Sequence, residues 1–240
     1  MEIIIHGTGK MGHVLLHTIE ELKEDKITGF CDELTDEKGD IIIDFSHFSR
    51  IENELLYAKE HKIPLVIGTT GYSDEIYEKI KETSKYIPIL LASNMSLGVN
   101  VFAEVLKKVV PLLSQNFDIE VIETHHNKKI DAPSGTAKTL INIIKDNSKK
   151  ELHEQYGRNG ISKRENNEIG VHSLRGGTVA GEHSVIFYGD DEVFEIKHKA
   201  FSKKIFAKGA IKGANLLLNR ENGLYSINDL MNCSHLKPSF

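Results

Sequence analysis

The 240-residue sequence contains no tryptophan and two cysteines, Cys31 and Cys233. Two cysteines cannot form a disulfide framework or a cysteine-rich metal site. No apolar run approaches the roughly 18 residues that a membrane-spanning helix needs. The first residues, MEIIIHGTGKMG, lack the basic region and the cleavage site of a secretory signal. These absences favour a cytoplasmic protein with no membrane partner.

The sequence also lacks an excess of positive charge. It carries 30 Lys and Arg against 35 Asp and Glu, a formal net charge of −5. Nucleic acids are bound by basic surfaces, so no nucleic-acid partner is expected. Hydrophobic residues make up 40% and charged residues 27%, which is typical of a globular protein, and the length suits one large domain or two small ones.

Short apolar runs alternate with helical patterns through the first part of the chain. Strands are expected at residues 3–5, 27–31, 40–45, 64–67 and 87–92. Continuously apolar strands separated by helices are typical of a parallel sheet that is covered on both faces. The sequence therefore predicts an α/β domain with a Rossmann-like parallel sheet.

The pattern changes near Ser96. A long helix is expected from residue 97, and a second helix is expected after Ser134. Strands are expected at 117–124, 171–174, 179–188 and 193–198, with a closing helix around 205–217. Residues 145–168 are polar and are expected to form a mobile or partner-contacting loop. Successive strands predict an antiparallel or mixed sheet, so this part reads as α+β and two domains are expected.

A glycine pattern follows the first expected strand. The segment Gly7-Thr8-Gly9-Lys10-Met11-Gly12 reads G-x-G-x-x-G and leads into a helix. These glycines permit a tight turn and let backbone N–H groups approach a pyrophosphate at the helix N-terminus. Asp32 ends the second expected strand, where a carboxylate accepts hydrogen bonds from ribose hydroxyls. An ordinary turn is the alternative, but this context favours dinucleotide binding.

Two further loops follow expected strands of the same sheet. Gly68, Thr69 and Thr70 follow the fourth strand, and Ala92, Ser93, Asn94 and Met95 follow the fifth. Ligands of open α/β sheets bind at the carboxyl ends of strands. Small residues and hydroxyls there suit a nicotinamide ribose and carboxamide. Without the glycine pattern, ordinary turns would be the better interpretation.

The densest polar cluster lies between an expected strand and an expected helix. Its candidate residues are His125, His126, Lys129, Ser134, Gly135 and Thr136. Ser134 is a natural N-cap, so the following N–H groups would form an anion site at the positive end of the helix dipole. Imidazole can exchange a proton near neutral pH. The cluster therefore suits a small carboxylate substrate beside a proton donor.

Simpler interpretations of this cluster exist. Ser134 can serve only as a helix cap, and the histidines can be solvated loop residues. A metal site on His125 and His126 is disfavoured because neighbours on a strand point to opposite faces, so no metal site is predicted. A structural role is expected for the later residues Arg175, Gly176, Gly177, Glu182 and His183.

The string HHNKKIDAPSGTA, taken with GTGKMG, GTTG, NMSLGVN and RGGTVAGEH, closely resembles the 4-hydroxy-tetrahydrodipicolinate reductase (dihydrodipicolinate reductase) family. The resemblance runs from Ile3 to about Leu218. It implies reduction, by NADH or NADPH, of the cyclic imine formed from 4-hydroxy-tetrahydrodipicolinate in the diaminopimelate route to lysine. It also implies a dinucleotide-binding domain at 1–94 and 207–240 and a substrate-binding and oligomerisation domain at 95–206, which assembles into a homotetramer.

The resemblance also implies residue roles. His125 takes the position of the family's proton donor and acceptor, and Lys129 that of its second proton donor. The dicarboxylate substrate would contact His126, Ser134, Gly135 and Thr136.

Cofactor choice is predicted from the end of the second strand. Enzymes that prefer NADPH usually place a cation there, whereas this sequence reads Cys31-Asp32-Glu33. NADH is therefore expected to be preferred, although Lys10 or Lys38 could soften the preference. Two rival functions are disfavoured. A semialdehyde dehydrogenase needs a thiolate nucleophile, and neither cysteine is suitably placed. A non-catalytic nucleotide-binding protein would not need His125 with Lys129.

Overall fold

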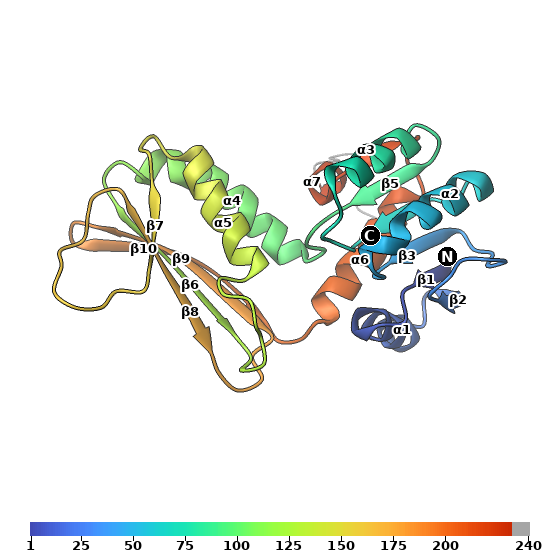
Figure 1. The fold of residues 1–240 in the computed structure, drawn as a ribbon, viewed down its shortest axis with the longest axis horizontal. Coiled ribbons are helices and arrows are strands. Elements are labelled where there is room, and N and C mark those ends of the chain that lie inside the picture. Colours follow the sequence, from blue (N-terminus) through green and yellow to red (C-terminus); the bar gives the residue numbers. More distant parts are fainter. Residues whose placement is uncertain (232–240) are drawn as a thin grey trace, which may run out of the picture. The chain divides into compact units, whose positions relative to one another are not determined.

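The computed structural model describes residues 1–231 and divides the chain into two compact units. Unit 1 comprises Met1–Leu97 and the chain from Lys203 onward, and unit 2 comprises Gly98–Ser202. The chain thus leaves unit 1, builds unit 2 and returns (Figure 1). Cys233 and the remainder of 232–240 lie outside the described residues. Within the described part, no helix combines the length and the hydropathy that crossing a membrane would require.

Unit 1 is a six-stranded parallel sheet with helices on both faces, in the strand order β11-β5-β4-β3-β1-β2 (Figure 1). Its strands are β1 (Glu2–His6), β2 (Lys26–Cys31), β3 (Ile41–Asp44), β4 (Leu65–Ile67), β5 (Pro88–Leu91) and β11 (Gly223–Tyr225). Its helices are α1 (Lys10–Leu22), α2 (Ile51–His61), α3 (Asp74–Thr83), α6 (Lys204–Leu217) and α7 (Ile227–Met231), with a 3-10 turn at Phe48–Arg50. The predicted Rossmann-like α/β architecture is confirmed.

Side chains of the central strands alternate between the two faces of this sheet. Ile3 and Ile5 of β1 pack with Leu15 of α1 and with α6. Ile4 instead packs with Leu55 of α2 on the other face. Because the side-chain period of a strand is two, the next even-numbered residue of β1 also faces α2.

Unit 2 is a five-stranded mixed sheet, as predicted, in the order β10-β9-β6-β8-β7. Its strands are β6 (Asp118–His125), β7 (His153–Tyr156), β8 (Glu168–Arg175), β9 (Gly181–Gly189) and β10 (Glu192–Ala200), and its helices are α4 (Leu97–Leu113) and α5 (Gly135–Asn147). β6 pairs parallel with β8 and antiparallel with β9. Leu106 of α4 and Leu140 of α5 share one buried cluster with Val121 and Phe187, so both helices cover the same face of the sheet (Figure 1).

The prediction of one long loop over residues 145–168 is wrong. α5 continues to Asn147, and β7 (His153–Tyr156) pairs parallel with β8. The remaining segment is also held, because Arg164 forms an ion pair with Asp118 at 2.8 Å and donates to the carbonyl oxygen of Glu168 at 2.7 Å. The strand sequence HEQY contains almost no apolar residue, so hydrophobic patterning gave no signal for it.

Candidate functional site

The glycine loop of unit 1 packs tightly against the residue that follows β3, whereas its end at the start of α1 has no side chain over it. Gly7 has φ +106°, and a Cβ there would lie 2.6 Å from the carbonyl oxygen of Phe45. A Cβ on Gly12 would collide with the carbonyl oxygen of Gly7. Gly9, the N-cap of α1, has no atom within 4 Å of its Cβ position and no side-chain cap bond. This arrangement fits a pyrophosphate held by the N–H groups of Lys10, Met11 and their neighbours.

Asp32 lies beside this loop, at the carboxyl end of β2. The N–H of Thr8 donates to its Oδ1 at 3.0 Å, and the Thr8 hydroxyl donates to Oδ2. Arg50 Nη1 lies 2.5 Å from Oδ1. The hydrogen bonds from Thr8, with the ion pair to Arg50, lower the pKa of Asp32 to about 2. Asp32 is therefore a carboxylate at neutral pH and remains half-exposed.

The loops 68–70 and 92–95 of unit 1 contain both exposed and buried side chains. Thr70 and Ser93 are exposed, whereas the side chain of Met95 is buried in the core of the unit, which leaves only its backbone for a ligand. Thr69 is buried, and its hydroxyl has no hydrogen-bond partner in the described chain. Asn94 Oδ1 accepts the N–H of Ser96 at 2.9 Å, which shapes the second loop.

In unit 2, His125 is the last residue of β6 and is held by a fully buried carboxylate. Its Nδ1 lies 2.5 Å from Oε2 of Glu123, two residues earlier on the same face of the strand. Because a carboxylate only accepts, Nδ1 carries the hydrogen. The N–H of Ser134 donates to the other oxygen, Oε1, at 3.1 Å. The orientation of the His125 ring is thereby fixed.

Arg175 of β8 completes the support of Glu123. Its Nη1 and Nη2 donate to the two carboxylate oxygens at 2.9 and 2.7 Å, a bidentate pair. Burial alone would raise the pKa of Glu123, but the hydrogen bonds from Arg175 and His125 outweigh it and hold the pKa below its ordinary value. Glu123 is thus an ionised, buried acceptor for the His125 ring.

The N-terminus of α5 adjoins this chain of contacts. Ser134 caps the helix, because its Oγ accepts the N–H of Ala137 at 3.2 Å. The same hydroxyl lies 3.0 Å from Nε2 of His183, to which it can donate. Burial, with the neighbouring His125, lowers the pKa of His183 to about 4, so His183 is neutral near pH 7. Gly135 is exposed, with nothing within 4 Å of its Cβ position.

Lys129 lies in the loop between β6 and α5. Its Nζ forms an ion pair with Asp131 Oδ1 at 2.7 Å, and its N–H donates to the carbonyl oxygen of His126 at 3.1 Å. The hydrogen bond from Lys129 lowers the pKa of Asp131. The side chain of Lys129 is partly exposed, so the ammonium group has access to a ligand.

The structure joins residues that sequence analysis kept apart. The sequence analysis did not predict Glu123 as a site residue, and it predicted structural roles for Arg175 and His183. In the structure Arg175 contacts Glu123, and His183 contacts Ser134. Pairing register explains the juxtaposition: Arg175 is the partner of His125 across β6 and β8, and His183 is the partner of Glu123 across β6 and β9. The strand period would have placed Glu123 beside His125. Arg50 had no sequence signal.

Comparison with known proteins agrees across both units. A family model described as dihydrodipicolinate reductase, N-terminus, matches residues 25–95, and one described as dihydrodipicolinate reductase, C-terminus, matches residues 98–231. A 4-hydroxy-tetrahydrodipicolinate reductase of Brachyspira hyodysenteriae is 52% identical over 231 residues, covering 96% of this chain and 100% of the relative. One of Clostridium novyi is 41% identical and covers 96% and 98%.

A solved structure extends the comparison to the fold. The dipicolinate-bound dihydrodipicolinate reductase from Paenisporosarcina sp. TG-14 matches with a TM-score of 0.72 and 22% identity, covering 94% of this chain and 97% of that one. At this identity the match supports the shared architecture alone.

Proposed function

The chain belongs to the dihydrodipicolinate reductase family, and we propose that its two units divide the work, unit 1 binding the nicotinamide cofactor and unit 2 the substrate. The protein is an oxidoreductase that reduces 4-hydroxy-tetrahydrodipicolinate with a nicotinamide cofactor, in the diaminopimelate route to lysine. The resemblance noted in the sequence is confirmed. The roles of individual residues are our proposal.

The glycine loop supports the placement of the cofactor in unit 1. When bound, the nicotinamide supplies the hydride. The open N-terminus of α1 offers N–H groups to the pyrophosphate, and Asp32 offers carboxylate oxygens to the adenosine ribose. The loops 68–70 and 92–95 at the ends of β4 and β5 would contact the nicotinamide half.

The single observation that carries the catalytic proposal is the Arg175–Glu123–His125 chain. Glu123 fixes the Nδ1–H of His125, so the proton that goes to the substrate would leave from Nε2. Lys129 would be the second proton donor. An ionised Glu123 would stabilise a protonated His125 ring before transfer and orient it afterwards.

The start of α5 supports a carboxylate site beside His125. The N–H groups of Gly135 and Thr136 belong to the first turn, where the helix dipole favours an anion. The hydroxyl of Ser134 is engaged as the cap, so its contribution is to hold the turn. His126 would contact the substrate from the preceding loop. The substrate is a small dicarboxylate.

NADH is our proposal for the preferred cofactor. A 2′-phosphate would lie near the carboxylates of Asp32 and Glu33, which repel it. Arg50 softens this repulsion, because its guanidinium lies 2.5 Å from Asp32. A modest preference is therefore expected, on the order of tenfold, which corresponds to about 1.4 kcal/mol of charge interaction.

We also propose a homotetramer assembled through unit 2. The edge strand β10 carries Val193 and Phe194 with 60% and 42% of their surface exposed, and Tyr188 of β9 is 43% exposed. Exposed apolar side chains on an edge strand are typical of a sheet that pairs with another copy. Light scattering coupled to size exclusion would give the mass of the assembly, and a monomer would refute the proposal.

A coupled assay tests the activity. A synthase that makes 4-hydroxy-tetrahydrodipicolinate supplies the substrate, and absorbance follows oxidation of NADH or NADPH. Oxidation that requires both synthase and reductase is the expected result. His125→Gln is the matched variant, because it should bind cofactor normally. Loss of cofactor binding in that variant would contradict the proposed division of labour.

A further inference from the structure

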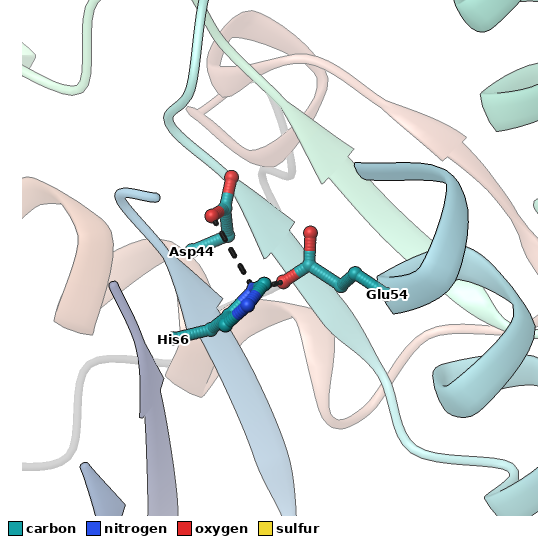
Figure 2. Close-up of side chains that lie close together, drawn as sticks. All are labelled: His6, Asp44 and Glu54. Atoms are coloured by element: carbon teal, nitrogen blue, oxygen red, sulfur yellow. Dashed lines mark hydrogen bonds and ion pairs between the residues drawn. The ribbon is translucent and has the colours of Figure 1, made fainter. Parts of the chain in front are cut away.

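Three titratable side chains meet inside unit 1: His6, Asp44 and Glu54 (Figure 2). Nδ1 of His6 lies 2.8 Å from Oε1 of Glu54 and 3.6 Å from Oδ1 of Asp44. All three are buried, with 2%, 1% and 0% of the surface of His6, Glu54 and Asp44 exposed. We call this group the His6 cluster.

The topology of the sheet accounts for the His6 cluster. His6 and Asp44 are register partners at the carboxyl ends of β1 and β3. Both are even-numbered residues in strands whose even-numbered positions, Ile4 and Ile42, face α2. Glu54 comes from α2. Three separate elements therefore converge on one point.

The hydrogen bonds of His6 leave one ring nitrogen as a potential ligand. Nε2 lies 3.2 Å from the carbonyl oxygen of Asp32. A carbonyl only accepts, so Nε2 carries a hydrogen. Nδ1 shares a proton with Glu54 at 2.8 Å, and a metal ion bound at Nδ1 would take the place of that proton. Metal-ligating histidines commonly donate their other N–H to a carbonyl in this way.

The carboxylates of the His6 cluster are incompletely satisfied. Oδ2 of Asp44 and Oε2 of Glu54 are buried without a hydrogen-bond partner. Among residues 1–231, His6 alone forms an ion pair with either carboxylate, and no Lys or Arg does. Buried carboxylate oxygens without a donor are costly, so two carboxylates beside a single imidazole call for a further proton or a bound cation.

We propose that the His6 cluster binds a divalent transition-metal ion of the zinc class. Its ligand atoms lie within 4.8 Å of one another. A tetrahedral Zn²⁺ about 2.1 Å from its ligands holds them about 3.4 Å apart, close to the separations from Nδ1. One imidazole with two carboxylates balances the ion's charge and favours Zn²⁺ over Mg²⁺, which prefers oxygen ligands.

A pocket provides a route for the ion. It has a volume of about 280 Å³, and its lining includes His6 and Glu54 together with Asp32 and Arg50. The ion would join β1, β3 and α2 below this pocket. The competing explanation is a proton instead of a metal, with a neutral Glu54 donating to Nδ1 of His6.

Metal binding by chelator-treated, tag-free protein tests the proposal. Equilibrium dialysis against Zn²⁺ should give one tightly bound ion per chain, and Co²⁺ should produce visible d–d absorption. Glu54→Gln and Asp44→Asn should each weaken Zn²⁺ binding by at least about 10–100-fold, the loss that is usual even for a residue that only supports a ligand. Glu52→Gln is the matched control, because Glu52 lies on the same helix but is exposed and paired with Lys79.

A second control concerns the other group of metal-binding residue types, His153, Glu165 and Glu168, of which the first two are exposed. His153→Asn should leave the stoichiometry unchanged. Thermal unfolding of the wild type tests the proposal even where a variant fails to fold. Zn²⁺ should raise the Tm of the chelator-treated protein, and chelator should lower the Tm of the zinc-loaded protein. Wild-type protein that binds no Zn²⁺, or Glu54→Gln that binds it as well as wild type, would overturn the proposal in favour of a shared proton.

Discussion

Gly181 leaves space beside Nε2 of His125, the nitrogen proposed to donate the proton: a Cβ on Gly181 would lie 3.0 Å from it. The opposite nitrogen, Nδ1, is held by Glu123 at 2.5 Å. The contact with Glu123 holds the ring at Nδ1, and the missing side chain of Gly181 leaves Nε2 room on the side of β9. The position of Nε2 is therefore set by β6 and β9 together.

Gly181→Ala should lower kcat. The added methyl group would be tighter against Nε2 than an ordinary contact, so the ring would shift by a few tenths of an ångström. We expect about a tenfold loss of turnover with an unchanged Kd for the cofactor, because proton transfer depends on position. Gly176→Ala is the control, since its Cβ position has no atom within 4 Å. If Gly181→Ala and Gly176→Ala have the same kcat, the space left by Gly181 does not matter for turnover.

His125→Gln should lower kcat by about 10²–10⁴-fold, the usual contribution of a general acid. The variant keeps a donor for Glu123, so folding should be preserved. Cofactor affinity should change little, because the glycine loop belongs to the other unit. Steady-state kinetics at saturating substrate, with fluorescence titration of the cofactor, measure both quantities. Near-normal turnover would show that another group supplies the proton.

Lys129→Ala should weaken both catalysis and ligand binding. The ammonium group is proposed to donate a proton and to contact the substrate carboxylate. Pyridine-2,6-dicarboxylate is a stable planar mimic of the substrate, and its Kd, measured by calorimetry, should rise in the variant. Lys128→Ala is the matched control, because its exposed side chain is the neighbour in the same loop. Unchanged affinity in Lys129→Ala would remove Lys129 from the site.

His183 should make the protein less stable in mild acid. Its pKa is about 4 in the folded chain, whereas an unfolded histidine titrates near 6.5. The unfolded state therefore binds more protons between these values, and stability is lost as pH falls through this window. The expected loss from His183 is about 2 kcal/mol between pH 7 and pH 5.

Urea unfolding at both pH values measures this effect. His183→Gln should show a smaller difference than wild type, because Gln has no proton to gain and can still bond Ser134. His125, Glu123, His198 and Lys129 also act on His183, so the comparison between the two proteins carries the result. Identical pH dependence in wild type and variant would refute the prediction.

Arg50→Ala should sharpen the preference for NADH. The guanidinium is the nearest cation to Asp32, so its loss removes the charge that would offset a 2′-phosphate. The ratio of kcat/KM for NADH to that for NADPH should rise by a few-fold, as one screened charge contact implies. Asp32→Asn should lower the same ratio. A wild-type preference for NADPH would mean that Arg50 outweighs Asp32.

Most strands of unit 1 were predicted because they are continuously apolar; the isoleucines of β1 and β3 are the clearest case. β7 and β11 were missed, because one is polar and the other has three residues. Both depend on pairing with a neighbouring strand. Local propensity therefore identified the strands with apolar residues, including the edge strands β2 and β10, and could not identify the polar β7 or the three-residue β11.

In the candidate site, too, the sequence predicted residues that are neighbours along the chain and not those that only strand pairing brings together. His125, Lys129 and Ser134 lie in one contiguous segment, and the sequence predicted them together. Glu123 could have been added from the strand period alone. Arg175 and His183 are separated from His125 by many residues, and only the pairing register of β6 with β8 and β9 brings them near.

The placement of α6 has a consequence for synthesis on the ribosome. Ala207, Ala210, Ala214 and Leu217 have no exposed surface and pack in the core that also contains Ile3 of the first strand. That core stays open on one side until α6 has emerged. Unit 2 is one contiguous stretch, Gly98–Ser202, and is complete earlier. Unit 2 is therefore expected to complete its folding on the nascent chain before unit 1 does, although unit 1 contains the N-terminus. This order is the reverse of the usual N-terminal-first folding.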